Sequence, residues 1–205
     1  MFQSPDSNSS SRPGLRRVLI VDDEPTLRLG FSYALQSQGT RVDTAAGGAS
    51  ALELAGGSRY DAVFLDLRMP DVDGLRVIEG LRDAGNQVPV VLCSAYITLE
   101  SALAAIRRGV VDFLIKPVSP ADLRHAFGFV TGGASTPLAK ALALAREKSF
   151  GDAVSILEEG GPRDVRTELW LRLLRHVVRG DEAPEVRAAL GDKIAEQVAL
   201  RSDAA

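Results

Sequence analysis

The chain has 205 residues, of which 45% are hydrophobic and 25% are charged. This composition is typical of a globular protein that buries a hydrophobic core, and it excludes a chain that is disordered throughout. The formal net charge of −3 provides no global positive potential that would attract nucleic acid or an anionic membrane. No segment has the length and hydrophobicity of a membrane span, so we expect no membrane-embedded part.

Cysteine usage and the first residues of the chain indicate a compartment. Cys93 is the only cysteine and cannot form an internal disulfide, and it lies in a hydrophobic run where we expect it to be buried. Residues 1–14 are rich in serine and lack the hydrophobic region of a signal peptide, so we expect them to form a disordered tail. Both observations favour a cytoplasmic location.

Between residues 15 and 130, short hydrophobic runs alternate with longer segments of helical periodicity. The runs are mostly continuous, as in parallel strands covered on both faces, and they predict five strands: Arg17–Val21, Arg41–Ala45, Ala62–Asp66, Val88–Ser94 and Asp112–Ile115. The other segments predict five helices: Pro25–Gln38, Gly48–Ala55, Gly74–Ala84, Leu99–Arg108 and Pro120–Val130. This alternation predicts an α/β fold with a five-stranded, doubly wound parallel sheet.

Proline and glycine residues mark the expected ends of these helices. Pro25 and Pro120 suit the first turn of a helix, where no backbone donor is needed. Gly39, Gly85 and Gly109 stand where three of the helices should stop. The boundaries therefore agree with the periodicity.

A different composition begins after residue 130. Residues 131–137 are small and polar and predict a flexible linker, and residues 138–205 contain three or four helical segments without a convincing strand. We therefore expect a small all-α C-terminal domain. It carries 11 Lys and Arg residues against 12 Asp and Glu residues, so it is not an obvious DNA-binding unit.

Polar residues lie at the ends of four of the predicted strands. Asp22 and Asp23 follow the first strand, Asp66 ends the third, Ser94 ends the fourth and Lys116 follows the fifth. Each has a structural explanation when taken alone, as a helix cap, a turn former or a surface cation. Because ligands of open parallel sheets collect beyond the carboxyl ends of the strands, we expect these five side chains to share one site.

The residue types in this group indicate phosphoryl chemistry. Three neighbouring carboxylates repel one another unless a hard cation neutralises them, and Mg²⁺ is the natural candidate because it accepts a few carboxylates together with water and phosphate oxygens. A carboxylate can then act as a nucleophile, while a lysine and a hydroxyl hold the phosphoryl oxygens. Such a set describes an aspartyl-phosphate site.

Four motifs together resemble the receiver domain of two-component response regulators, a flavodoxin-like fold. They are Val21–Glu24 (VDDE), Asp66–Gly74 (DLRMPDVDG), Ser94–Tyr96 (SAY) and the dipeptide Lys116-Pro117. The resemblance covers residues 15–130, and the motifs occur in the family's order. It implies that the protein is a signalling module, with no enzymatic activity beyond its own phosphorylation by a phosphohistidine donor and its autodephosphorylation.

The resemblance also implies roles for individual residues. Asp66 would be the phosphoacceptor and a direct Mg²⁺ ligand together with Asp23, whereas Asp22 would act largely through coordinated water. The backbone carbonyl of Arg68 would complete the protein ligands of the metal. Lys116 would contact the phosphoryl group, and the peptide bond that follows it is expected to be cis.

Further residues match the family's switch. Ser94 would supply the hydroxyl that binds the phosphoryl group, and Phe113 would be the switch aromatic, although an ordinary core phenylalanine is the alternative. Arg68 and Tyr96 occupy variable positions beside the phosphorylation site. The helix around residues 99–108, Phe113 and the helix around residues 120–130 would shift when Asp66 is phosphorylated.

The implied partners are a sensor histidine kinase or phosphotransfer protein and a downstream protein bound through the C-terminal helices, with a homodimer also possible. A phosphorylation-gated DNA-binding regulator is the alternative output, and a phosphate sink without an output is a third. Residues 145–157 faintly resemble one tetratricopeptide helix pair, and His176 sits in a fragment like a phosphotransfer motif, but a plain helical segment explains both better. Trp170 and the leucines around it should pack a small helical core or a partner surface.

Overall fold

The computed structural model describes most of the chain: residues 16–36, 39–95, 97–132, 136–160 and 164–179, together with residues 188 and 192. The tail predicted for residues 1–14 lies outside this part of the chain, as does Tyr96.

Five parallel strands form one sheet in the order β2-β1-β3-β4-β5. Their bounds are β1 (Arg17–Val21), β2 (Arg41–Ala45), β3 (Ala62–Asp66), β4 (Val90–Ser94) and β5 (Val110–Ile115). Every residue of β3 and β4 is buried, as the continuous hydrophobic runs predict. The predicted fold class is confirmed, and three strands have the predicted bounds.

The other two strands differ from the prediction at their first residues. β4 begins at Val90, two residues later than predicted, because Pro89 has no N–H for the sheet and the carbonyl of Val88 accepts a hydrogen bond from Arg82 instead. β5 begins two residues earlier, at Val110, which pairs with Val90 before an irregularity in the register. The hydrophobic pattern located both strands, but these local hydrogen bonds set their starts.

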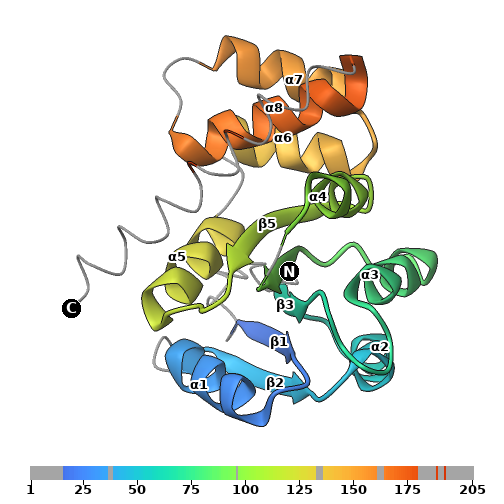
Figure 1. The fold of residues 1–205 in the computed structure, drawn as a ribbon, viewed down its shortest axis with the longest axis vertical. Helices are drawn as coiled ribbons and strands as arrows, with labels where there is room; N and C mark the ends of the chain where they lie inside the picture. Colours follow the sequence, from blue (N-terminus) through green and yellow to red (C-terminus); the bar gives the residue numbers. More distant parts are fainter. Residues whose placement is uncertain are drawn as a thin grey trace, which may run out of the picture.

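Five helices connect and cover the sheet: α1 (Pro25–Gln36), α2 (Gly48–Gly57), α3 (Gly74–Asp83), α4 (Leu99–Ile106) and α5 (Pro120–Thr131). All five were predicted, with last residues one or two positions from those observed, and residues 37–38 lie outside the described chain. α1 packs beside α5 on one face of the sheet and α2 beside α3 on the other (Figure 1). Gly39, Gly85 and Gly109 have φ angles of 69°, 73° and 75°, which confirms their role as helix stops.

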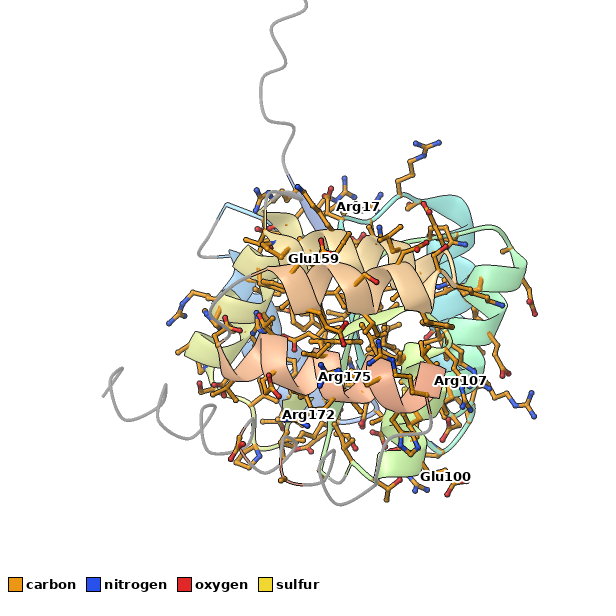
Figure 2. All side chains as sticks on the ribbon, turned by 90° about the horizontal axis from the view of Figure 1, so that it is seen from above. Arg17, Glu100, Arg107, Glu159, Arg172 and Arg175 are labelled. Atoms are coloured by element: carbon orange, nitrogen blue, oxygen red, sulfur yellow. The ribbon has the colours of Figure 1, made fainter. Side chains whose placement is uncertain are left out.

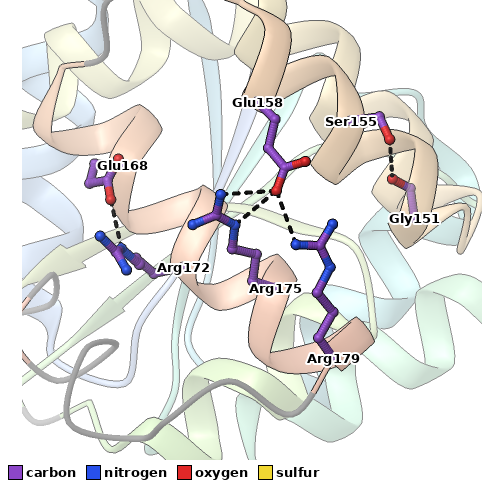
Figure 3. A network of polar contacts seen from close by, with 7 residues as sticks. All are labelled: Gly151, Ser155, Glu158, Glu168, Arg172, Arg175 and Arg179. Atoms are coloured by element: carbon purple, nitrogen blue, oxygen red, sulfur yellow. Dashed lines mark hydrogen bonds and ion pairs between the residues drawn. The ribbon is translucent and has the colours of Figure 1, made fainter.

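The described residues of the C-terminal region form three helices: α6 (Pro137–Arg146), α7 (Phe150–Glu159) and α8 (Val165–Arg179). They stack into a layer at the β5 side of the sheet (Figure 1). Trp170 and its neighbouring leucines are buried, as predicted, and Arg172 and Arg175 lie on the outer face of α8 (Figure 2). Glu158 of α7 accepts hydrogen bonds from Arg175 and Arg179 of α8 and so ties the two helices together (Figure 3).

α8 makes buried contacts with the sheet and with α5. The ring of Trp170 stacks on the ring of Phe113 in β5, with the centroids 5.7 Å apart. Arg166 forms an ion pair of 3.0 Å with Asp112, and its guanidinium lies 4.3 Å from the ring centre of Phe129 in α5. The sheet edge at β5 is therefore covered by the C-terminal helices, which protects an otherwise open edge strand.

Candidate functional site

The predicted site residues meet at the carboxyl ends of β1, β3 and β5. Carboxylate oxygens of Asp22, Asp23 and Asp66 lie within 4.8 Å of one another. Asp22 and Asp66 are buried, whereas Asp23 is exposed. The structure therefore brings the acidic group together as the strand pattern predicted.

Lys116 lies between the two buried carboxylates. Its Nζ atom is 2.8 Å from Oδ2 of Asp66 and 2.8 Å from Oδ2 of Asp22. Burial acts to lower the pKa of Lys116, but hydrogen bonds and charge from the two aspartates outweigh it, so the pKa is raised. The lysine is therefore a fixed cation in the site. The peptide bond between Lys116 and Pro117 is cis, as predicted.

Asp66 is at the centre of the group. Its Oδ1 atom accepts a hydrogen bond of 3.3 Å from the backbone N–H of Arg68. Burial raises the pKa of Asp66 above its usual value, while the contacts with Lys116 and Arg68 act to lower it. A ligand that reaches the Asp66 carboxylate would therefore also lie close to the charged groups of Lys116 and Asp22.

Two contacts near Asp22 were not predicted. Its Oδ1 atom accepts a hydrogen bond of 2.9 Å from the backbone N–H of Glu24. The guanidinium of Arg28, one turn into α1, donates a hydrogen bond of 2.6 Å to the carbonyl of Asp22. Arg28 fixes the backbone that carries the two adjacent carboxylates, and only the proximity of Arg28 to the VDDE motif in the sequence could have indicated this role.

Ser94 and Phe113 lie in the strands next to this group. Ser94 is the last residue of β4 and is buried, and its carbonyl accepts a hydrogen bond of 2.8 Å from the backbone N–H of Lys116. Phe113 is buried and contacts Trp170 of α8. Arg68 is exposed beside the acidic group. The buried state of Cys93 in β4 is confirmed.

The remaining residues of the DLRMPDVDG motif shape the loop after β3. The carboxylate of Asp71 accepts hydrogen bonds of 3.2 Å from the backbone N–H groups of Gly48 and Ala49 at the start of α2. Asp73 is the N-cap of α3 and accepts a hydrogen bond from the N–H of Leu75. These carboxylates anchor helices and leave Asp66 as the motif's residue in the acidic group.

Comparison with known proteins agrees with this geometry. The model of the family described as "Response regulator receiver domain" matches residues 18–128 of the chain. The chain belongs to the response regulator receiver family. Its fold is similar to that of the chemotaxis response regulator CheY4 of Vibrio cholerae, with 29% identity and a TM-score of 0.54 over 57% of this chain and 98% of that chain.

Relatives of known sequence match the receiver part of the chain. It is 39% identical over 103 residues to the regulatory protein AtoC of Escherichia coli, and the matched residues are 50% of this chain and 22% of that protein. It is also 39% identical over 107 residues to the transcriptional regulatory protein PrrA of Mycobacterium tuberculosis, which is 52% of this chain and 46% of that protein. The match therefore spans less than half of the length of these relatives.

The donor set of this receiver fits Mg²⁺. Asp22, Asp23 and Asp66 supply oxygen atoms close enough to surround one hard cation, and the exposure of Asp23 leaves room for water ligands. The receiver structure of TrrA from Thermotoga maritima, 30% identical with a TM-score of 0.52 over 57% of this chain and 99% of that chain, is described as a complex with Mg²⁺ and BeF.

No helix among the described residues is long and hydrophobic enough to cross a membrane.

Proposed function

We propose that this protein is a response regulator that accepts a phosphoryl group on Asp66 from a sensor histidine kinase or a phosphotransfer protein and thereby controls its C-terminal helices. The observation that carries the proposal is the position of the Asp66 carboxylate. It lies beside Lys116 and Asp22 at the carboxyl ends of the strands. This is a nucleophile with a fixed cation next to it.

The chain's own residues account for the transfer step. An oxygen of Asp66 forms a bond to phosphorus as the bond from phosphorus to the donor's imidazole nitrogen breaks, and the histidine leaves as the neutral ring after it gains a proton. Lys116 then pairs with a phosphoryl oxygen, and Ser94 donates a hydrogen bond to another. Mg²⁺, held by Asp22, Asp23, Asp66 and the carbonyl of Arg68, would supply charge neutralisation. Later attack of water on phosphorus returns Asp66 and inorganic phosphate.

Phosphorylation by a small phosphodonor tests the site. The full chain incubated with Mg²⁺ and acetyl phosphate should gain one acid-stable, base-labile acyl phosphate, seen as an added phosphoryl mass. The Asp66→Ala variant should gain none, whereas Asp152→Asn, which changes an exposed carboxylate at the start of α7, should behave like the wild type. Modification of the Asp66→Ala variant at the wild-type level would refute the assignment.

Removal of the metal supplies a second readout for the same site. Chelation of Mg²⁺ should reduce phosphorylation strongly, because the buried carboxylates would then repel the incoming phosphoryl group. The Asp23→Asn variant should need more Mg²⁺ than the wild type for the same phosphorylation rate, since it loses one ligand. Equal rates with and without Mg²⁺ would contradict the metal assignment.

The proposed output acts through the contact between β5 and α8. Phe113, next to the site in the sheet, stacks on Trp170, and Asp112 pairs with Arg166 beside it. A phosphoryl group that draws in Ser94 and Lys116 would change the ends of β4 and β5, and so would favour a state in which this contact is weaker. The freed face of α8 would then bind a downstream protein.

A DNA-binding output is the alternative, because PrrA is named as a transcriptional regulatory protein. The outer arginines of α8 are paired with glutamates, Arg172 with Glu168 and Arg175 with Glu158 (Figure 3), which disfavours phosphate-backbone binding. A gel-shift assay on genomic fragments at 50 and 200 mM salt separates the two outputs. Binding that requires phosphorylation and weakens steeply with salt would establish the DNA-binding output.

The domain division and location belong to the same proposal. We assign residues 15–130 to the receiver, 131–137 to a linker and 138–205 to the helical output domain, after a tail of residues 1–14. The two ends of this linker belong to helices, since Thr131 is the last residue of α5 and Pro137 the first of α6. A phosphohistidine donor and a lone buried Cys93 both suit the cytoplasm. Homodimer formation through the receiver is a further expectation, and sedimentation with and without a phosphoryl mimic would test it.

A further inference from the structure

A cavity of about 470 Å³ lies where three helices end, away from the acidic site. It is bounded by the ends of α3 and α4, from the receiver, and by the end of α6 and the turn that follows it. Five cationic side chains line it: Arg82, Arg107, Arg108, Arg146 and Lys148. Cavities at the junction of two structural units are frequent sites of ligand binding.

The cationic side chains that line this cavity outnumber the carboxylates that line it. The two carboxylates in its lining belong to Glu79 and Asp83, and Glu79 is already paired with Arg108 and Arg76. Helix C-termini attract cations, but each carries only about half a negative charge. The three helix ends therefore offset about one and a half charges, while the lining has three more cations than carboxylates.

Arg82, one of the lining residues, is held in place by the backbone around it. Its guanidinium donates hydrogen bonds of 2.8 to 3.2 Å to four backbone carbonyls, those of Asn86, Val88, Arg108 and Gly109. Burial and, to a smaller extent, the positive charge of Arg146 lower the pKa of Arg82 to about 10. Arg82 and Arg146 both line the cavity, and each adds to its positive charge.

The C-terminal region brings Arg146 and Lys148 to this place through a close approach of α6 to the receiver backbone. A Cβ atom on Gly109 would lie 3.1 Å from Cγ of Arg146, so the absence of a side chain there allows α6 to end against the start of β5. Lys148 has a φ of 62° and is the one non-glycine residue with a positive φ in the described part of the chain. This residue ends α6, because the N–H of Ser149 donates a hydrogen bond of 2.9 Å to the carbonyl of Leu144, and the conformation costs free energy for lysine but not for glycine.

We propose that this junction binds a small molecule that carries a phosphate or diphosphate group, with Arg146 and Lys148 contacting the anion from one side and Arg107 from the other. Guanidinium groups recognise phosphate oxygens through paired hydrogen bonds, which suits this set of side chains. The bound anion would bridge the receiver and the C-terminal helices and would hold them together. This site is separate from the acidic group around Asp66.

Binding of pyrophosphate, inorganic phosphate and ATP to the full chain tests the proposal, by calorimetry and thermal unfolding at low salt with chelator present. At least one probe should bind saturably and raise the melting temperature, because a ligand of the folded state stabilises it. Lys148→Gly should weaken this binding about tenfold, since it removes one charge-assisted contact. The same variant should be at least as stable as the wild type, because glycine adopts the positive φ without strain. Loss of binding in this variant cannot then be attributed to unfolding.

Two controls make the outcome decisive. Arg146→Gln should weaken binding as Lys148→Gly does, whereas Lys140→Gln, which removes an exposed cation from the same helix, should leave it unchanged. Absence of saturable binding by every probe would overturn the proposal, and so would equal weakening in the Lys140→Gln variant, which would indicate diffuse attraction. Binding of duplex DNA but of none of the small probes would also overturn it, in favour of a nucleic-acid surface.

Discussion

Gly74 shows how closely the chain approaches itself behind the phosphoacceptor. A Cβ atom at Gly74 would lie 2.4 Å from the carbonyl oxygen of Asp66 and 2.9 Å from Cα of Leu67. Both are backbone atoms, so no side-chain rotation can relieve the overlap. The backbone N–H of Gly74 also donates a hydrogen bond of 2.9 Å to the carbonyl of Leu67. The start of α3 therefore rests directly on the residue pair that positions the reactive carboxylate.

We predict that Gly74→Ala lowers both stability and phosphorylation. Overpacking of this kind destabilises proteins by about 1 to 3 kcal/mol, and the required shift would displace Asp66. Gly30→Ala is the matched control, because Gly30 is an exposed residue of α1, nothing lies within 4 Å of its Cβ position, and alanine should stabilise the helix by about 0.5 to 1 kcal/mol. Urea unfolding and acetyl phosphate labelling give the two readouts. A Gly74→Ala variant with wild-type values in both would contradict this account.

The role of Asp66 could be predicted from the sequence, whereas the requirement for glycine at position 74 could not. Asp22, Asp66 and Lys116 were found from sequence because each stands at the end of a hydrophobic strand, and parallel strands end at one edge. The requirement for glycine at position 74 depends on how near two loops pass, which no local pattern records. Arg28 was missed for a different reason, since its partner is a backbone carbonyl and not a side chain that the motif displays.

Among the elements, α8 connects the two parts of the chain. Arg166 pairs with Asp112 of β5, approaches Nδ1 of His125 in α5 to 3.3 Å and lies over the ring of Phe129. The sequence predicted both α8 and β5 but not their contact, because a single charged residue in a buried strand gives no indication of its partner 54 positions later. Periodicity identifies elements, whereas long-range pairing depends on three-dimensional packing.

We predict that Arg166→Met destabilises the protein by about 3 kcal/mol, because it leaves the buried carboxylate of Asp112 without its guanidinium. The double variant Asp112→Asn/Arg166→Met should recover much of this loss, since no uncompensated charge remains. Arg172→Met is the control: its pair with Glu168 is partly exposed on the surface of α8 and should contribute less than about 1 kcal/mol. Urea unfolding measures all three, and a single variant no weaker than the control would argue against a structural ion pair.

In the whole molecule, the C-terminal helices extend the hydrophobic core of the receiver. Trp170 is fully buried and stacks on Phe113. Phe113 lies in β5, three residues before Lys116, so this contact is close to the acidic group. An interface of this kind can be shifted by a modest change in the receiver.

The single tryptophan of the chain reports on that interface during unfolding. Without a ligand, the urea transitions followed by Trp170 emission and by far-UV circular dichroism should coincide, because the buried contacts join the two parts into one cooperative unit. With Mg²⁺ and beryllium fluoride as phosphoryl mimic, the receiver should gain stability while the α8 contact weakens. A weakening of about 1 to 2 kcal/mol would move the Trp170 transition to lower urea by roughly 1 M. In the Asp66→Ala variant the two transitions should stay together with or without the mimic. If the mimic moved both transitions upward by the same amount in the wild type, Asp66 would stabilise the receiver without controlling its C-terminal helices.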